Sequence, residues 1–441
     1  MSGGIGAARG TALCVGAVLG PGVLVLPAVA VRAAGPASLL AWAALLGVST
    51  LVATSFAALG ARYPNVGGVS AFTRRAFGDG AAAVVGCWLF AAVPAGVVAG
   101  AVVGARYITT ALQAPPAAVA GTVVALLTVV YAANLVGLHL SARVQLVLTG
   151  AVVALLIAVV AVAGPRVDPD RITPFAPHGM AGIGSAAAVL FTSICGWEAT
   201  ANLSAEFTHP RLVRRVAGAS LAVIVVLYTG LAVCTVGVLG DQAGDTPVPL
   251  MRLLAPADQP WAAGAVAVAA MLLTVAASVT FVAAGARTGV ALARHRVLPA
   301  GLAATSGGQP RRSVAVQAGA ATIVAVAAAA APRLITVETL MRLFAALLVC
   351  VTLIGLAAAV RLLPEPRQRA SAAVAALAVA AVAALSGPFL LAPAAVAAAI
   401  LMRRRRTSTP PAVRPPAADA AGQDGVSKLL PYPTAMLARL R

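Results

Sequence analysis

The chain alternates from end to end between long apolar stretches and short segments that carry most of its arginines. A helix that spans a lipid bilayer needs about 20 predominantly apolar residues. We therefore predict an all-α polytopic membrane protein with about 12 transmembrane helices. The predicted helices cover residues 11–31, 38–60, 81–110, 117–138, 145–163, 182–206, 213–239, 261–291, 313–331, 335–361, 370–386 and 388–402.

The composition argues against a water-soluble domain. Hydrophobic residues make up 61% of the chain and charged residues only 10%. A soluble fold needs more polar side chain to cover its surface, whereas lipid covers the apolar surface of a membrane protein. Residues 407–441 differ, since they are rich in proline and show no sustained helical period. We expect them to form a disordered cytoplasmic tail.

The basic residues behind the net charge of +19 are spread unequally between the two predicted sides of the membrane. With the N-terminus in the cytoplasm, 20 basic residues lie at inner ends and loops and six lie at outer ones. This asymmetry places both termini, including the short segment 1–10, in the cytoplasm of a multi-pass plasma-membrane protein. It also argues against a nucleic-acid partner. The basic inner loop 287–312 is expected to contact anionic headgroups, so membrane lipid is a partner.

Residues that carry enzymatic or metal chemistry are sparse. The five cysteines and four histidines are dispersed, which gives neither a disulfide framework nor a metal spacing. The single lysine, Lys428, lies in the tail, so a Walker A site is absent. We expect no metal and no cofactor. An enzyme is disfavoured, and any transport by this chain is expected to be driven by gradients.

The first apolar stretch contains an interruption. It reads GAVLGPGVLVLP over residues 16–27, with Gly20, Pro21 and Gly22 in its middle. Glycine and proline interrupt a helix and leave backbone N–H and C=O groups unpaired. Inside a membrane such groups are tolerated only where they lie against protein or line a polar cavity. The interruption therefore predicts a cavity. A Gly–Pro kink that serves packing alone is the alternative.

The sixth stretch holds a matching interruption. It reads SAAAVLFTSICGWEATANLSAEFTHP over residues 185–210, with Gly196 near Glu198. A carboxyl group inside a membrane span is costly and therefore suggests a functional role for Glu198. A structural role, in which the carboxyl group holds neighbouring helices together, is an equal alternative. Glu206 is predicted to end this helix at the cytoplasmic face. Since five spans separate corresponding positions, the spacing indicates a five-plus-five inverted repeat with two extra helices.

These stretches resemble a known family. GAVLGPGVLVLPA resembles the first-helix G-x-G signature of the amino acid–polyamine–organocation (APC) permeases, and CGWEATANLSAEFTHP resembles their sixth-helix signature. RYPNVGGVSAFTRRAFG (62–78) and NLVGLHLSARVQLVLT (134–149) are similar to two further segments of these permeases. WLFAAVPAG (88–96) with EFTHP (206–210) looks most like the bacterial methionine and branched-chain amino-acid exporters.

The resemblance implies a LeuT-type fold. One repeat would cover about 11–163, the second about 182–361, and the extra helices about 370–402. In this family, amides of the first break hold the substrate carboxylate and freed carbonyls meet its amino group. The corresponding amides here belong to Gly20, Gly22 and Val23. The corresponding carbonyls belong to Ala17, Val18, Thr192 and Cys195.

The chain departs from the family at three points. Pro21 has no N–H and so removes one carboxylate donor, while its fixed φ suits the start of a half-helix. Thr192 stands where many relatives carry an aromatic gate, which leaves Phe191 and Trp197 as nearby gate candidates. No lysine occurs in 149–152, where some proton-coupled relatives have one, so the coupling ion, proton or sodium, stays open.

The leading hypothesis is a secondary active transporter of apolar amino acids that works by alternating access. Export is compatible with the exporter-like motifs. A carrier of polyamines or other organic cations, in which Glu198 meets a positive group, is the alternative within transport. A membrane sensor without transport is the alternative outside it. Direction and oligomeric state do not follow from the sequence.

Overall fold

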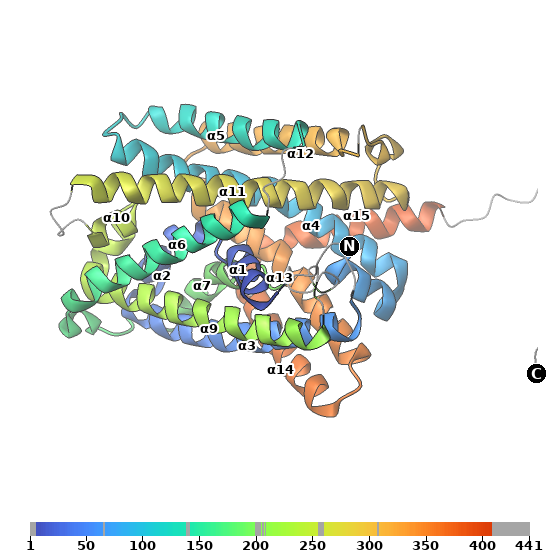
Figure 1. The fold of residues 1–441 in the computed structure, drawn as a ribbon, viewed down its shortest axis with the longest axis horizontal. Helices are drawn as coiled ribbons and strands as arrows, with labels where there is room; N and C mark the ends of the chain where they lie inside the picture. Colours follow the sequence, from blue (N-terminus) through green and yellow to red (C-terminus); the bar gives the residue numbers. More distant parts are fainter. Residues whose placement is uncertain are drawn as a thin grey trace, which may run out of the picture.

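The computed structural model describes residues 6–64, 67–137, 142–198, 204, 207, 209–254, 260–306 and 308–407. Within these ranges the regular elements are helices, and no strand forms (Figure 1). The main helices are α1 (Ala7–Val18), α2 (Leu26–Ala34), α3 (Ser38–Arg62), α4 (Gly68–Ala111), α5 (Ala118–Leu135), α6 (Ala142–Ala163), α7 (Gly179–Leu190), α9 (Pro210–Cys234), α10 (Pro249–Leu254), α11 (Pro260–Arg294), α12 (Arg311–Ala330), α13 (Val337–Leu362), α14 (Pro366–Leu385) and α15 (Leu391–Thr407).

The structure places a helix in each of the twelve predicted stretches. Nine helices of the described part are long and apolar enough to cross a membrane. Three shorter apolar helices cover Ala7–Val18, Gly179–Ile194 and Gly387–Arg403. The first two belong to the stretches with predicted interruptions, and the third precedes the tail. The predicted class, an all-α polytopic membrane protein, is confirmed. The predicted disorder of the tail falls almost wholly outside the described residues.

One helix is longer than its predicted stretch. α4 begins at Gly68 rather than near residue 81, and its two parts join across a kink at Gly78, where φ is 84°. The segment before the kink contains Arg74, Arg75 and neighbouring polar residues, so it is not apolar enough to be predicted as part of a membrane span. A helix that lies at the end of the bundle needs no apolar window, which is why hydropathy alone missed it.

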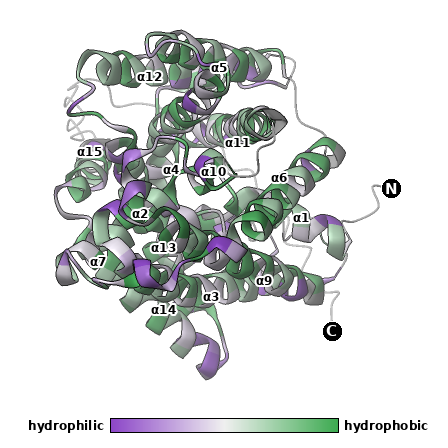
Figure 2. Cartoon of the chain, turned by 90° about the vertical axis from the view of Figure 1, so that its left-hand side faces the viewer, coloured by the Kyte–Doolittle hydropathy of each residue, from purple (hydrophilic) through white to green (hydrophobic). Residues whose placement is uncertain are grey.

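The helices form a bundle whose outer faces are apolar. α5 and α12 lie along one edge and α3 and α9 along the opposite edge, with α4, α11 and α13 between them (Figures 1 and 2). Large aliphatic side chains point outward on the edge helices, for example Val226 (70% exposed), Ile323 (72%) and Leu377 (73%). Such a surface is stable in lipid and not in water.

The centre of the bundle is packed around α4. Ala92, Val98 and Ala105 of this helix are fully buried. Gly100 lets the first stretch approach closely, since a Cβ atom there would lie 2.8 Å from Cγ of Pro21. The broken part of the first stretch is therefore held against the most buried helix of the molecule.

Candidate functional site

The first stretch is interrupted between α1 and α2. α1 ends at Val18, Gly20 is extended (φ −79°, ψ 176°), and a single 3-10 turn, η1 (Pro21–Leu24), precedes α2. Pro21 occupies the first position of this turn, where its missing N–H costs nothing. Glycine and proline thus produce the break at the position that the sequence predicts.

The second interruption follows α7. The 3-10 turn η5 (Phe191–Ile194) continues α7, after which Cys195 becomes extended (φ −70°, ψ 142°). Gly196 has a φ of +120°, a conformation that side-chain-bearing residues rarely adopt. The helix therefore stops at Ile194 because the next two residues leave helical geometry.

The two interruptions touch each other. A Cβ atom on Gly196 would lie 2.5 Å from the carbonyl oxygen of Ala17 and 3.0 Å from Cα of Val18. Only a residue without a side chain permits this approach of one backbone to another. The contact brings together chain segments about 180 residues apart in sequence.

A half-buried carboxylate fixes the second interruption. Glu198 Oε2 accepts a hydrogen bond from the N–H of Gly196 at 2.8 Å, and its Oε1 accepts one from the hydroxyl of Thr352 at 2.9 Å. Thr352 lies on α13. Since both carboxylate oxygens are bonded, Glu198 links the second break to a neighbouring helix and satisfies a backbone donor that the break frees.

Aromatic side chains bind the interruptions to their surroundings. The indole N–H of Trp197 donates to Ser49 Oγ of α3 at 2.7 Å. Tyr228 of α9 donates to the carbonyl of Val18 at 3.4 Å. Tyr107 of α4 donates to the carbonyl of Leu24 at 2.7 Å and accepts the N–H of Leu250 at 3.2 Å. The bonds to Val18 O and Leu24 O satisfy backbone groups of the first break, and the bond to Ser49 fixes Trp197 against α3.

The predicted carboxylate donors differ in availability. The N–H of Gly20 donates to Val18 O at 2.8 Å, and the N–H of Val23 donates to Gly20 O at 3.1 Å. The N–H of Gly22 has no acceptor among the described residues. In this conformation one predicted donor is free, and the other two are used within the break.

The predicted carbonyl acceptors are mostly free. Val18 O accepts hydrogen bonds from Gly20 and Tyr228. The carbonyls of Ala17, Thr192 and Cys195 receive no donor from the described part of the chain. Within the described residues, the interruptions therefore leave one N–H and three carbonyls unpaired, from two touching segments.

The remaining predicted residues have other surroundings. Phe191 is 2% exposed and Trp197 is fully buried, and the indole of Trp197 is bound to α3 as described. The hydroxyl of Thr192 donates to the carbonyl of Val189 in its own helix. Glu206 lies outside the described residues. Trp197 thus serves packing in this conformation, and its role as a gate stays a prediction.

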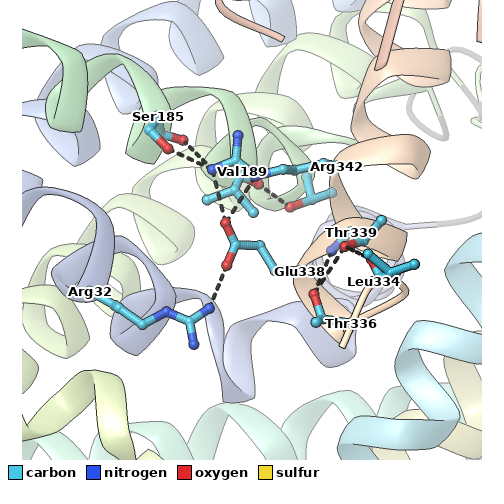
Figure 3. A network of polar contacts seen from close by, with 9 residues as sticks. Arg32, Ser185, Val189, Leu334, Thr336, Glu338, Thr339 and Arg342 are labelled. Carbon is cyan, nitrogen blue, oxygen red and sulfur yellow. Dashed lines mark hydrogen bonds and ion pairs between the residues drawn. The ribbon is translucent and has the colours of Figure 1, made fainter. Parts of the chain in front are cut away.

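A polar network joins the end of α2, the middle of α7 and the start of α13 on one side of the interruptions (Figure 3). Arg342 binds Glu338 one turn earlier on α13, with Nε 3.0 Å from Oε1, and its Nη2 donates to Ser185 Oγ of α7 at 2.6 Å. The other oxygen of Glu338 pairs with Arg32 at the end of α2. Glu338 and Arg342 stand four residues apart, a spacing at which helical side chains of opposite charge meet. The partnership with Arg32 has no signal in the sequence.

Sequence reasoning also missed residues that bind the breaks. Tyr107, Tyr228, Thr352 and Ser49 are polar side chains inside apolar stretches, and that is the signal that marks them as candidates. The signal does not say which partner each one binds. Two further polar side chains have other partners: Asn134 donates to Val279 O of α11 at 3.3 Å, and Thr280 bonds its own helix.

Paired interruptions that lend backbone groups near the middle of two spans are typical of secondary transporters. The amino acid permease family matches residues 6–412, and the chain belongs to this family. The resemblance to APC permeases that the two signatures indicate is thereby confirmed.

Three relatives illustrate the match. The uncharacterized amino acid permease YecA of Bacillus subtilis (strain 168) is 35% identical over 202 residues, which are 46% of this chain and 48% of the relative. The L-methionine/branched-chain amino acid exporter YjeH of Escherichia coli (strain K12) is 34% identical over 244 residues, 54% of this chain and 57% of the relative. The chain thus spans about half the length of these two relatives. The branched-chain amino acid permease BcaP of Bacillus subtilis (strain 168) is 28% identical over 319 residues, 68% of each chain.

Proposed function

We propose that the chain is a secondary active transporter that moves amino acids across the cytoplasmic membrane by alternating access. The observation that carries the proposal is the contact between the two interruptions, which gathers unpaired backbone groups of both signs inside a membrane bundle. Lipid cannot satisfy such groups, and a small zwitterion can. Membership of the amino acid permease family supports the same conclusion.

The free groups suggest how a zwitterion binds. The N–H of Gly22 lies in the first turn of a half-helix, where the helix dipole favours a carboxylate. The carbonyls of Ala17, Thr192 and Cys195 suit an ammonium group. Gly20 and Val23 become further donors when the first break loosens its internal hydrogen bonds, and Val18 becomes a further acceptor. A substrate enters by displacing contacts between the two breaks.

An apolar amino acid fits the site better than an organic cation. Glu198 is the one charged side chain among the described residues of the two interruptions, and both its oxygens already accept hydrogen bonds. A polyamine would have to displace those bonds to reach it. YjeH is named as an exporter of methionine and branched-chain amino acids and BcaP as a permease of branched-chain amino acids, which supports an apolar substrate.

The first five spans and the next five form the two inverted repeats in this proposal, with α14 and α15 appended. Both termini lie in the cytoplasm, as the distribution of arginines indicates. The network of Arg32, Glu338 and Arg342 then lies on the outer side. It closes that side by binding the outer halves of both broken helices to α13, and alternating access requires it to open.

The test is uptake into proteoliposomes that contain the purified chain. We expect labelled leucine or methionine to exchange against the same unlabelled amino acid, and putrescine to fail as a counter-substrate. Imposing a pH or a sodium gradient then identifies the coupling ion. Exchange of putrescine without leucine would replace the proposal by the cation carrier. Absence of flux with each amino acid of a complete panel would favour a sensor.

A further inference from the structure

A small cavity lies where the end of α5 meets the segment that leads into α12 and the last third of α11. Its wall is mostly apolar, and its polar side chains are Asn134, Arg287 and Gln309. Its volume is about 80 Å³. α11 contributes Ala283, Ala286 and Arg287, α5 contributes Asn134, the segment before α12 contributes Gln309, and α12 contributes Val314. Since one water occupies about 30 Å³ of liquid, the cavity holds a group of roughly two to three waters in size.

The wall of the cavity is fixed by the protein itself. Asn134 is 5% exposed, and its amide donates to Val130 O at 2.9 Å and to Val279 O at 3.3 Å. These bonds join α5 to α11 beside the cavity. The guanidinium of Arg311 also donates to Leu135 O at 3.2 Å, which joins α12 to the end of α5. The cavity is therefore preformed.

The charges around the cavity have one sign. Arg287 is exposed and has no hydrogen-bond or ion-pair partner among the described residues. Arg311 and Arg312 begin α12, and neither binds a carboxylate of the described part. The N-terminal end of α12 adds the positive end of a helix dipole. The cavity is lined by Arg287, which has no partner among the described residues, and by no acidic residue, so it suits an anion.

The surface beside the cavity is apolar. α5 and α12 run side by side along one edge of the bundle, away from the interrupted helices (Figures 1 and 2). Val136, Val316 and Ile323 on these helices are 68%, 47% and 72% exposed. An anion that binds at the cavity therefore has an exposed hydrocarbon-like surface directly beside it.

We propose that this cavity binds the phosphate of an anionic phospholipid, with Arg287 as its principal cation and the acyl chains lying along α5 and α12. Basic pockets between spanning helices bind anionic headgroups in this way. A soluble phosphate would use the cation but gain nothing from the apolar flank. The site is separate from the substrate site and does not depend on the transport activity.

The test measures which lipid stays with the protein. The full chain is reconstituted in vesicles of equal parts phosphatidylglycerol and phosphatidylcholine, extracted in mild detergent, and its retained lipid is quantified by mass spectrometry. We expect enrichment of phosphatidylglycerol, and a fall of about five-fold in that enrichment for Arg287→Gln, as expected for one arginine at an anionic surface. Arg287→Lys keeps the charge and should retain most of the enrichment.

Arg294→Gln is the matched control. Arg294 lies two turns further along α11, is equally exposed, and does not line the cavity. An equal fall in both variants would overturn the proposal in favour of diffuse surface charge. Equal retention of phosphatidylcholine by the unaltered chain would overturn it too, as would displacement of the lipid by inorganic phosphate in molar excess. Should Arg287→Gln not fold, Gln309→Ala tests the same wall.

Discussion

Both interruptions break a membrane helix and leave backbone groups unpaired within the described part of the chain, but different interactions hold each of them in place. The first consists of Gly20, Pro21 and Gly22, and internal backbone hydrogen bonds and the ring of proline hold it. The second depends on Gly196 in a glycine-only conformation and on side chains that reach it, Glu198 and, from α13, Thr352. The first break is therefore set mainly by the local chain, with Tyr107 and Tyr228 bound to its ends, and the second mainly by tertiary contacts. Substitutions should separate them.

The largest expected effect is that of Gly196→Ala. A methyl group there meets the Ala17 carbonyl, and its φ of +120° costs of order 1–3 kcal/mol for a residue with a side chain. Overpacking against backbone adds about 1–3 kcal/mol. We expect this variant to lose amino acid exchange in proteoliposomes and to melt at a lower temperature in detergent.

Gly20→Ala is the matched control for that substitution. Gly20 has a φ of −79°, and nothing lies within 4 Å of a Cβ atom built there. We expect a melting temperature close to that of the unaltered chain, because the added methyl group meets no protein atom. Equal damage from both substitutions would show that the first break is as dependent on its surroundings as the second.

The second prediction concerns the carboxylate. Glu198→Ala leaves the N–H of Gly196 and the hydroxyl of Thr352 without their acceptor, which costs about 1–3 kcal/mol in the free energy of unfolding. Glu198→Gln keeps an acceptor oxygen and should recover most of this loss when both variants are melted in the same detergent. Exchange by Glu198→Gln then shows whether transport needs the charge. Equal destabilisation by both variants would contradict the assigned role in hydrogen bonding.

The sequence predicts the class of fold and both interruptions, because apolar length and glycine or proline within a span are local signals. It indicates Glu198 for the same reason. It does not predict that the N–H groups of Gly20 and Val23 are used internally, since that depends on the turn that Pro21 starts. Nor does it show Arg32 beside Glu338, because two charges at the ends of distant helices have no local pattern. Features that depend on neighbouring residues can be predicted from the sequence, whereas contacts between distant helices of the bundle cannot.

The third prediction asks whether a side chain also supports the first break. Tyr107→Phe removes the donor to Leu24 O and the acceptor for Leu250 N–H. Since both groups are buried, we expect a loss of about 1–3 kcal/mol of stability. Tyr131→Phe is the control, since the Tyr131 hydroxyl is buried and has no partner among the residues that the structure describes. Removing it should leave the melting temperature unchanged or slightly raised. If both variants behave alike, the bond to Leu24 does not stabilise the break.

The smallest expected effect is that of Arg32→Gln, which opens the network in Figure 3 on the side of the first broken helix. The side chain of Arg32 is 53% exposed, so its pair with Glu338 contributes at most about 1 kcal/mol. That is a change of about five-fold in an equilibrium. In a variant whose one cysteine is Cys195, a membrane-impermeant thiol reagent applied from the Arg32 side should therefore react up to about five-fold faster. Arg333→Gln, an exposed arginine near the start of α13, should leave the rate unchanged. An unchanged rate in Arg32→Gln would mean that the network stabilises helix ends without closing the path to the second break.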